Sequence, residues 1–112
     1  MKLSDETMSR NEAILAEVEV IGGGYVWEAE VFAVNLMDVA AADGQVEDLQ
    51  HLRGVQQIAL NASKLSFRTV SAIAGIPGLE SLVLAQATLS SAQLHELQRI
   101  VPEVVLVGDQ KA

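Results

Sequence analysis

A repeat of 24 residues is the feature of this sequence that most constrains its fold. Residues 52–76 and 76–100 carry apolar side chains at seven matching positions, and a further copy of the same pattern begins at Val31. A unit of this size cannot bury an apolar face alone, so we predict that the copies stack on one another. The matching positions are Val31, Val34, Leu36, Ala41, Val46, Leu49 and Leu52, then Val55, Ile58, Leu60, Leu65, Val70, Ile73 and Ile76, then Leu79, Leu82, Leu84, Leu89, Leu94, Leu97 and Ile100.

The spacing of these positions changes halfway through each copy. Leu82 and Leu84 alternate with other residues, which places both on one face of a short strand. Leu94, Leu97 and Ile100 recur at every third position, which is typical of one face of a helix. Each copy is therefore predicted to form a strand, a bend, a helix and a return, which is the segment that connects the helix to the next strand.

Serines precede two of the predicted helical halves. Ser90 lies three residues before Gln93, an arrangement that indicates a capping box at the start of a helix. Ser66 and Thr69 form a weaker version of the same signal one copy earlier. These serines predict where the helical halves of the second and third copies begin.

Residues 31–108 resemble the leucine-rich repeat superfamily, in its short bacterial type with 24-residue repeats. The resemblance lies in LESLVLAQATLSSAQLHELQRI and QQIALNASKLSFRTVSAIAGI, which follow the family form LxxLxLxxNxL with a helical half after it. It implies an α/β fold: a right-handed solenoid of about three repeats and a terminal strand, with a short parallel concave sheet and helices on the convex side. The chain departs from the family at Val39, Ser63 and Ala87, where Asn, Cys or Thr usually satisfies buried backbone groups. Of these three, only Ser63 could do so, and the alternative is that backbone bonds or water close the bends.

Residues 9–30 are predicted to cap the first repeat with a helix and a short strand. Ser9 and Glu12 form a candidate capping box for a helix over residues 9–21, and Gly22–Gly24 would end that helix. Residues 25–27 then read as a strand that pairs with residues 31–36, with Tyr25 and Trp27 expected to pack under the cap helix.

The two tails and the last strand complete the predicted organisation. Residues 1–8 and 109–112 are polar and are expected to be mobile. Pro102 is expected to end the last helix and to precede a final strand over residues 104–107. The best alignment of Pro77 with Pro102 needs a shift of 25 residues instead of 24.

The charge and composition exclude several classes of partner. A net charge of −8 without a basic cluster argues against nucleic acid and anionic lipid. No apolar run is long enough to span a bilayer, and the N-terminal residues do not form a secretion signal, so we expect no membrane partner and a cytoplasmic location. The absence of Cys excludes disulfides. Residues 1–30 hold seven acids and two bases, so most of the negative charge lies in the predicted N-terminal cap. The net charge therefore implies no basic partner for the repeats.

No motif predicts catalysis, a cofactor or a metal site. The glycine triplet follows a helix and precedes a strand, which is the reverse of the order in a phosphate-binding loop. His51 and His95 have no second histidine at helical spacing, as a zinc pair would need, and both fall in convex halves. The acids Asp43, Glu47 and Asp48 lack the spacing of a calcium loop and are expected at a solvated helix start.

The concave face and the last strand are the candidate interaction surfaces. The resemblance implies a protein partner, as yet unidentified, on the concave face, although this face carries no Trp, Tyr or Arg. Val104, Val105, Leu106 and Val107 form a strand that is apolar on both faces, and an open edge there would favour a homodimer. The candidate concave residues are Asn35, Met37, Gln57, Ala59, Asn61, Ser81 and Val83, together with Ala33 and Ala85.

Two other functions compete with a non-catalytic scaffold. A small regulatory domain of the anti-sigma-factor-antagonist type would have a phosphorylatable Ser63 or Ser66 after a central strand, but such a domain needs no 24-residue period. An enzyme would gather His51 or His95 with carboxylates in a concave pocket. The sequence favours the scaffold.

Overall fold

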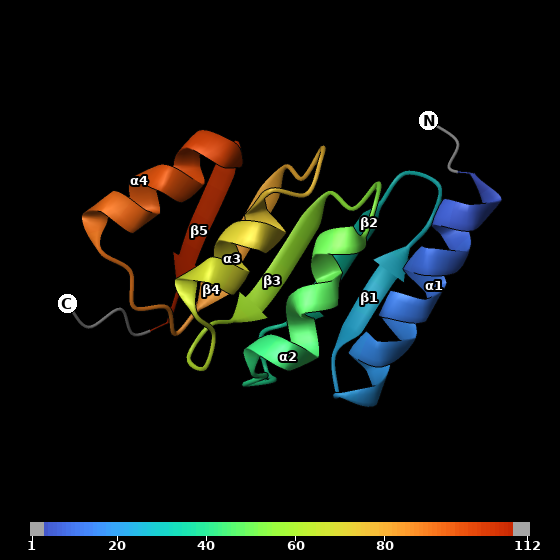
Figure 1. Cartoon of the computed structure of the whole chain (residues 1–112), viewed down its shortest axis with the longest axis horizontal. Coiled ribbons are helices and arrows are strands. Elements are labelled where there is room, and N and C mark those ends of the chain that lie inside the picture. The colour runs from blue at the N-terminus through green and yellow to red at the C-terminus, as the bar shows by residue number, and fades with distance from the viewer. Residues whose placement is uncertain (1–3, 109–112) are drawn as a thin grey trace.

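The computed structural model describes residues 4–108 and has an α/β fold built on a five-stranded, mostly parallel sheet (Figure 1). The strands follow one another across the sheet in sequence order, so the prediction of an α/β chain with a parallel sheet is confirmed. The elements are α1 (Asp5–Val20), β1 (Gly24–Trp27), β2 (Phe32–Leu36), α2 (Asp43–Val46), the 3₁₀ helix η1 (Glu47–His51), β3 (Gln57–Asn61), α3 (Phe67–Ala74), β4 (Ser81–Ala85), α4 (Ser91–Ile100) and β5 (Glu103–Val107).

The 24-residue spacing sets the register of three parallel strands. Gln57 of β3 pairs with Ala33 of β2 on one side and with Ser81 of β4 on the other. Equivalent positions of the three copies therefore lie side by side. The predicted hairpin is also confirmed, because β1 runs antiparallel to β2 with Trp27 beside Phe32.

The core lies between the sheet and the helices, which cover one face of the sheet (Figure 1). The helical halves contribute buried side chains such as Leu49, Ile73 and Leu97. Full burial of such a side chain stabilises a fold by about 1.5–3 kcal/mol, so this shared layer holds the copies together. The strand residues that point into the layer are Val34, Leu36, Ile58, Leu60, Leu82 and Leu84, all at most 1% exposed.

Helix α1 begins earlier than the sequence predicted. The Ser4 side-chain oxygen accepts a hydrogen bond from the Thr7 backbone N–H at 3.1 Å and caps the helix. Ser9 and Glu12 therefore lie inside the helix, and the predicted capping box there is wrong. Residues 5–8 are helical because Ser4 satisfies the first backbone donors of the helix, so the prediction of a mobile tail is wrong for these four residues. Residues 1–3 and 109–112 lie outside the described residues.

The predicted end of α1 at the glycine triplet is confirmed. Gly22 has a φ of 99°, and its N–H donates to the Glu19 carbonyl at 3.1 Å. The Gly23 N–H donates to the Val18 carbonyl at 2.8 Å. These two bonds form a Schellman motif, in which a left-handed residue satisfies the last carbonyls of a helix.

Asparagines close the bends after β2 and β3. The Asn35 side-chain oxygen accepts from the Met37 backbone N–H at 2.9 Å, and that of Asn61 accepts from the Ser63 N–H at 3.0 Å. Both are short local turns in which the side chain replaces a backbone acceptor. Ser63 takes part through its backbone N–H. The expected backbone bonds are also present, because the Val39 N–H donates to the Leu36 carbonyl at 3.1 Å and the Leu65 N–H donates to the Ala62 carbonyl at 3.2 Å.

The serine caps of the later helices are confirmed. The Ser66 side-chain oxygen accepts from the Thr69 N–H at 3.3 Å, and α3 begins at the next residue. Ser90 and Gln93 form the predicted capping box, with reciprocal bonds of 3.1 and 3.0 Å. Local sequence signals therefore fix where both helices start.

The last strand is displaced from the repeat spacing. β4 and β5 pair with an offset of 22 residues, since Ser81 lies beside Glu103. Helix α4 has 10 residues against 8 in α3, but the return to β5 takes two residues where the return to β4 takes six. The shift of 25 taken from the prolines is wrong because Pro77 lies within the longer return, whereas Pro102 directly precedes β5.

Two of the predicted core positions are exposed, and they lie at the ends of the repeat ladder. Val31 is 49% exposed and Ile100 is 45% exposed, while the other repeat positions are buried or half-buried. Their neighbours Phe32 and Val101 are buried instead. An end position has no adjoining copy to hold it in register, so the next apolar residue takes its place.

Candidate functional site

The sheet face opposite the helices, called here the open face, carries side chains in rows set by the strand register. Its residues alternate along each strand with those that enter the core. One row consists of Val26, Ala33, Gln57, Ser81 and Glu103, the next of Gly24, Asn35, Ala59, Val83 and Val105, and the third of Asn61, Ala85 and Val107.

The predicted concave residues fall on this face with one exception. β2 ends at Leu36, so Met37 lies in the following turn and not in a row. Ala59 and Ala85 are on the face but are only 4% and 7% exposed, because larger neighbours flank them. A partner on the open face would therefore meet the longer side chains, such as Gln57, more than the alanines.

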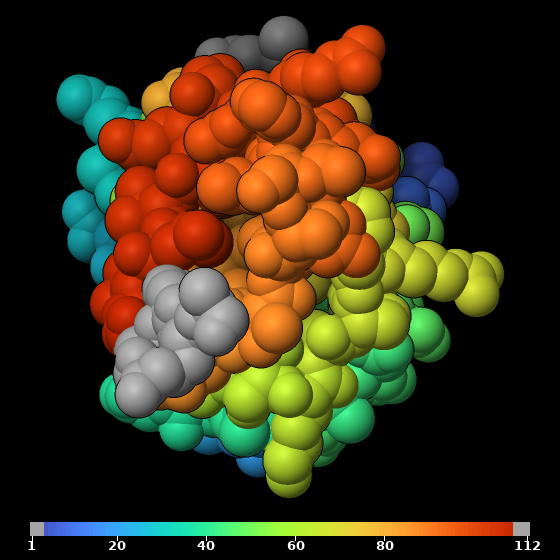
Figure 2. Space-filling view, turned by 90° about the vertical axis from the view of Figure 1, so that its left-hand side faces the viewer, coloured from blue at the N-terminus to red at the C-terminus, as the bar shows by residue number. Residues whose placement is uncertain are grey.

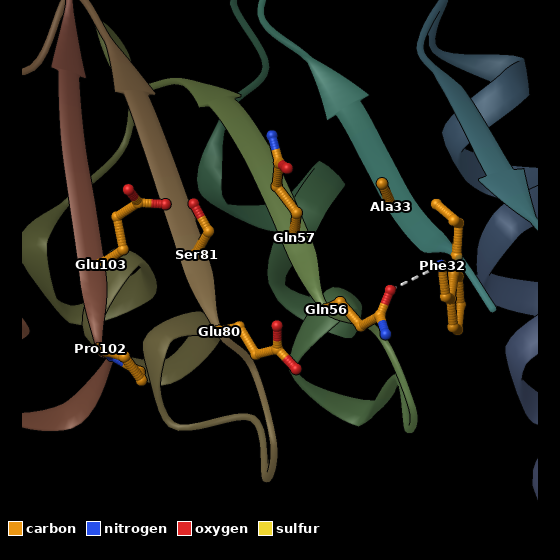
Figure 3. A pocket seen from close by; sticks show the side chains of 9 residues that line it. Phe32, Ala33, Gln56, Gln57, Glu80, Ser81, Pro102 and Glu103 are labelled. Carbon is orange, nitrogen blue, oxygen red and sulfur yellow. Dashed lines mark hydrogen bonds between the residues drawn. The ribbon is translucent and has the colours of Figure 1, made fainter.

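A shallow groove crosses the open face where the parallel strands begin (Figure 3). Its volume is about 580 Å³. Of its lining residues, the sequence predicts Ala33, Gln57 and Ser81 as binding residues. It does not predict Gln56 and Glu80, although they occupy equivalent places one repeat apart, directly before β3 and β4. The lining residues are Val31, Phe32, Ala33, Gln56, Gln57, Glu80, Ser81, Pro102 and Glu103.

Gln56 organises the floor of the groove. Its side-chain oxygen accepts a hydrogen bond from the Phe32 backbone N–H at 3.2 Å (Figure 3). The Gln56 backbone N–H donates to the Phe32 carbonyl at 2.8 Å. Its carbonyl accepts from the N–H groups of Glu80 and Ser81 at 2.9 and 3.0 Å. The Gln56 side chain therefore adds a hydrogen bond to β2, and the Gln56 backbone bonds to both β2 and β4. Together these bonds hold the opening of the groove in place.

The charges around the groove are acidic. Glu80 and Glu103 are exposed at its β4 and β5 side, and their carboxylates are separate from the buried core (Figure 3). Each of the five bases within residues 4–108 lies outside its lining, and the bases are Arg10, Arg53, Lys64, Arg68 and Arg99. The fold gathers these two acids, which are far apart in the sequence, so the net charge of a single segment does not predict the acidic groove.

A second hollow lies beside the β1–β2 hairpin. Trp27 and Phe32 stack there with ring centroids 5.1 Å apart and planes 17° from parallel. Arg53 lines the same hollow and donates to the carbonyls of Gln50 and Leu52, so its guanidinium supports the backbone. The expectation that both aromatic residues pack under the cap helix needs correction, because Trp27 packs on Phe32 and Tyr25 is 39% exposed.

Of the other residues singled out from the sequence, His51 and Asp48 line a shallow hollow between η1 and α1. His51 and His95 are exposed, in η1 and α4 respectively. Among residues 4–108 there is no group of three His, Asp or Glu side chains that could hold a metal ion. Ser63 is exposed in a turn, and the Ser66 hydroxyl caps α3.

Asp43 has a structural contact instead of a place in a binding site. Its carboxylate accepts a hydrogen bond from the Ser66 backbone N–H at 2.9 Å. This bond, followed by one with the Ser66 side chain, holds the pKa of Asp43 below its ordinary value. The predicted acidic group therefore joins two neighbouring copies at this residue, while Glu47 and Asp48 are exposed at η1.

Comparisons with known proteins do not indicate a family or a function for this chain. No protein-family model, curated protein or solved structure matches the chain. Within the described residues, no helix has the length and apolar character required to cross a bilayer.

Proposed function

We propose that this chain is a non-catalytic protein-interaction module of the leucine-rich repeat type, and that its partner binds on the open face. The observation that carries the proposal is the asymmetry of the sheet: helices cover one face, and the other presents rows of small and polar side chains with a groove across them. Ligands in repeat proteins lie on such extended surfaces because every copy adds an equivalent strip.

The repeat type is supported by register. The parallel strands β2, β3 and β4 align at the 24-residue spacing, and the inward Leu, Ile and Val positions of every copy are buried together. This is how a stack of identical units buries a continuous core. The asparagine turns at Asn35 and Asn61 supply the bend that the family builds from a different position.

The chemistry of the groove indicates what the partner presents. Gln57 and Ser81 offer amide and hydroxyl groups, and Glu80 and Glu103 offer carboxylates. Carboxylates bind N–H donors of Lys and Arg more strongly than neutral donors, since the hydrogen bonds are charge-assisted. A polypeptide segment with a basic side chain fits this groove best.

The proposal is tested by capture from the native host with paired variants. The groove variant carries Gln57→Arg and Glu103→Lys. Its control carries Gln98→Arg and Glu96→Lys on the exposed side of α4, so the residue types and the net charge change are the same. We expect a partner that the unmodified chain and the control capture but the groove variant loses.

Other outcomes would contradict the open-face site. Loss of the partner with the α4 control alone would place binding on the helices. Equal capture by all three chains, or no specific partner with any of them, would also count against the groove. Circular dichroism of each variant checks that the fold is kept.

A further inference from the structure

The two ends of the sheet differ in how they are covered. At the N-terminal end, β1 pairs with β2, and α1 packs against β1 and η1 (Figure 1). At the other end, β5 is the outermost strand among residues 4–108, and Figure 2 shows β5 and α4 side by side at the surface. A stack of repeats needs a cap at each end, because the outer side of the last copy otherwise faces water.

The hydrogen bonds between β5 and β4 define which side of β5 faces outward. The Glu103 N–H donates to the Glu80 carbonyl at 3.1 Å, and the Val107 carbonyl accepts from the Gln86 N–H at 3.2 Å. In a strand, the backbone groups of alternate residues point to opposite sides. Val104 and Leu106 therefore direct their N–H and C=O groups away from β4.

The side chains of β5 suit pairing with another strand. Val104 and Leu106 are half-buried against the core, and Val105 on the open face is 36% exposed. The strand carries one charge, that of Glu103 at its first residue, and the following four residues are uncharged. Edges that avoid pairing usually carry Lys, Pro or a bulge, and this segment has none of them.

We propose that the edge of β5 is a homodimer interface, at which two copies of the chain pair their β5 strands antiparallel about a two-fold axis at Val105. Val104 of each copy then lies opposite Leu106 of the other, and both residues exchange backbone hydrogen bonds. Opposed residues share a face of the sheet, so Val104 and Leu106 stay on the helix side in both copies. This interface uses the outer edge of β5, of which Glu103 also lines the open-face groove, and it goes beyond the proposed function.

The ends of β5 set this register. Moving the axis to Val104 would place Leu106 opposite Pro102, which has no N–H to donate. Moving it to Leu106 would place Val104 opposite Gly108, which lies past the strand with a φ of 90°. The axis at Val105 is the arrangement that uses both outward-facing residues of each strand.

The distribution of charge favours this end of the molecule for self-association. Residues 4–30 hold seven acids and one base, and they form the end opposite β5. The chain measures 44 Å along its longest axis. Pairing through β5 thus keeps the two acidic ends apart by far more than the Debye length of about 8 Å at physiological salt.

The test is sedimentation equilibrium of the full chain over a range of concentrations. The unmodified chain is expected to dimerise. Val105→Lys places two ammonium groups opposite one another and should weaken the dimer more than tenfold, since cross-strand partners lie about 4.5–5.5 Å apart. Val83→Lys is the matched control, on the same row one strand inward, and should leave the dimer unchanged.

A charge swap identifies the axis. Val105→Lys and Val105→Glu chains are each expected to be monomeric, and an equimolar mixture of them should form dimers. The proposal would be overturned if the unmodified chain stayed monomeric at millimolar concentration, or if substitution of Val105 left the dimer unchanged. It would also be overturned if the mixture of the two variants stayed monomeric. Open-ended polymers would do so too, because they indicate head-to-tail pairing of β5 with β1.

Discussion

Gly23 occupies a position with no room for a side chain. An added Cβ would lie 2.9 Å from the Val18 side chain and 3.0 Å from the Asn35 carbonyl, and it would overlap Leu36. Gly23→Ala should therefore lower the free energy of unfolding by about 1–3 kcal/mol, as other overpacked substitutions do. Urea denaturation measures the change.

Gly24 provides the control for this prediction. A Cβ there meets nothing within 4 Å, and its φ is not positive. Gly24→Ala is expected to be neutral or slightly stabilising, since it only restricts the unfolded chain. If the two variants were equally stable, close packing at the end of α1 would not be what requires glycine at position 23.

Asn11 is a fully buried polar residue that fastens α1 to the first repeat. Its side-chain N–H donates to the Arg53 carbonyl at 2.9 Å, and its oxygen accepts from the Arg53 N–H at 3.1 Å. Asn11→Ala leaves both backbone groups unsatisfied, and we expect a loss of about 2–3 kcal/mol in the free energy of unfolding.

The neighbouring exposed residue serves as the reference. Glu12→Ala alters the same turn of α1 without touching Arg53 and should stay within about 0.5 kcal/mol of the unmodified chain. Thermal and urea unfolding of both variants would decide the matter. A near-neutral Asn11→Ala would mean that apolar contacts alone hold the cap in place.

The strands and helices differ in how far the sequence predicted them. The apolar repeat predicted the register of β2, β3 and β4, because one-residue slips would turn Ile58 and Leu60 to the open face. Ser66 and Ser90 predicted helix starts correctly, since a cap acts on its own next three residues. Such signals are local or strictly periodic.

The remaining elements depended on packing that no local signal records. Ser4 and Ser9 both satisfy the rule for a cap, and the sequence does not say which one begins α1. The offset of 22 at β5 arises from a longer helix and a shorter return, which compensate only in part. The groove was missed for a similar reason, because Gln56 and Glu80 meet only through the register of their strands.

Between elements, Asp43 links the start of α2 to the start of α3. Because the Ser66 N–H lowers its pKa in the folded chain, the ionised carboxylate stabilises the fold above the unfolded pKa. That contribution is lost as the pH falls through the folded pKa. Asp43→Asn should flatten the fall in stability on acidification, as followed by urea unfolding from neutral pH into the acid range.

Asp48→Asn removes the same charge at an exposed residue of η1 whose side chain makes no hydrogen bond or ion pair within residues 4–108. It is expected to retain the steep acid dependence of the unmodified chain. Identical pH profiles for the two variants would show that net charge, and not the contact with Ser66, governs acid unfolding.

For the molecule as a whole, stability is expected to decline from the centre of the sheet toward β5. β3 has a hydrogen-bonded strand on each side, and its Ile58 and Leu60 are at most 1% exposed, whereas Val104 and Leu106 are half-buried at the edge. Native-state hydrogen exchange should therefore show the slowest amides in β3 and fast exchange at Val104 and Leu106 in dilute solution.

Raising the protein concentration separates this gradient from simple fraying. Because the Val104 and Leu106 N–H groups are the ones that a second copy would bind, their exchange should slow with concentration while that of β3 stays fixed. The Val105→Lys chain should lose this dependence and keep the gradient. Protection of β5 equal to that of β3 in dilute solution would contradict the gradient, because it would require the edge strand to open only when the whole chain unfolds.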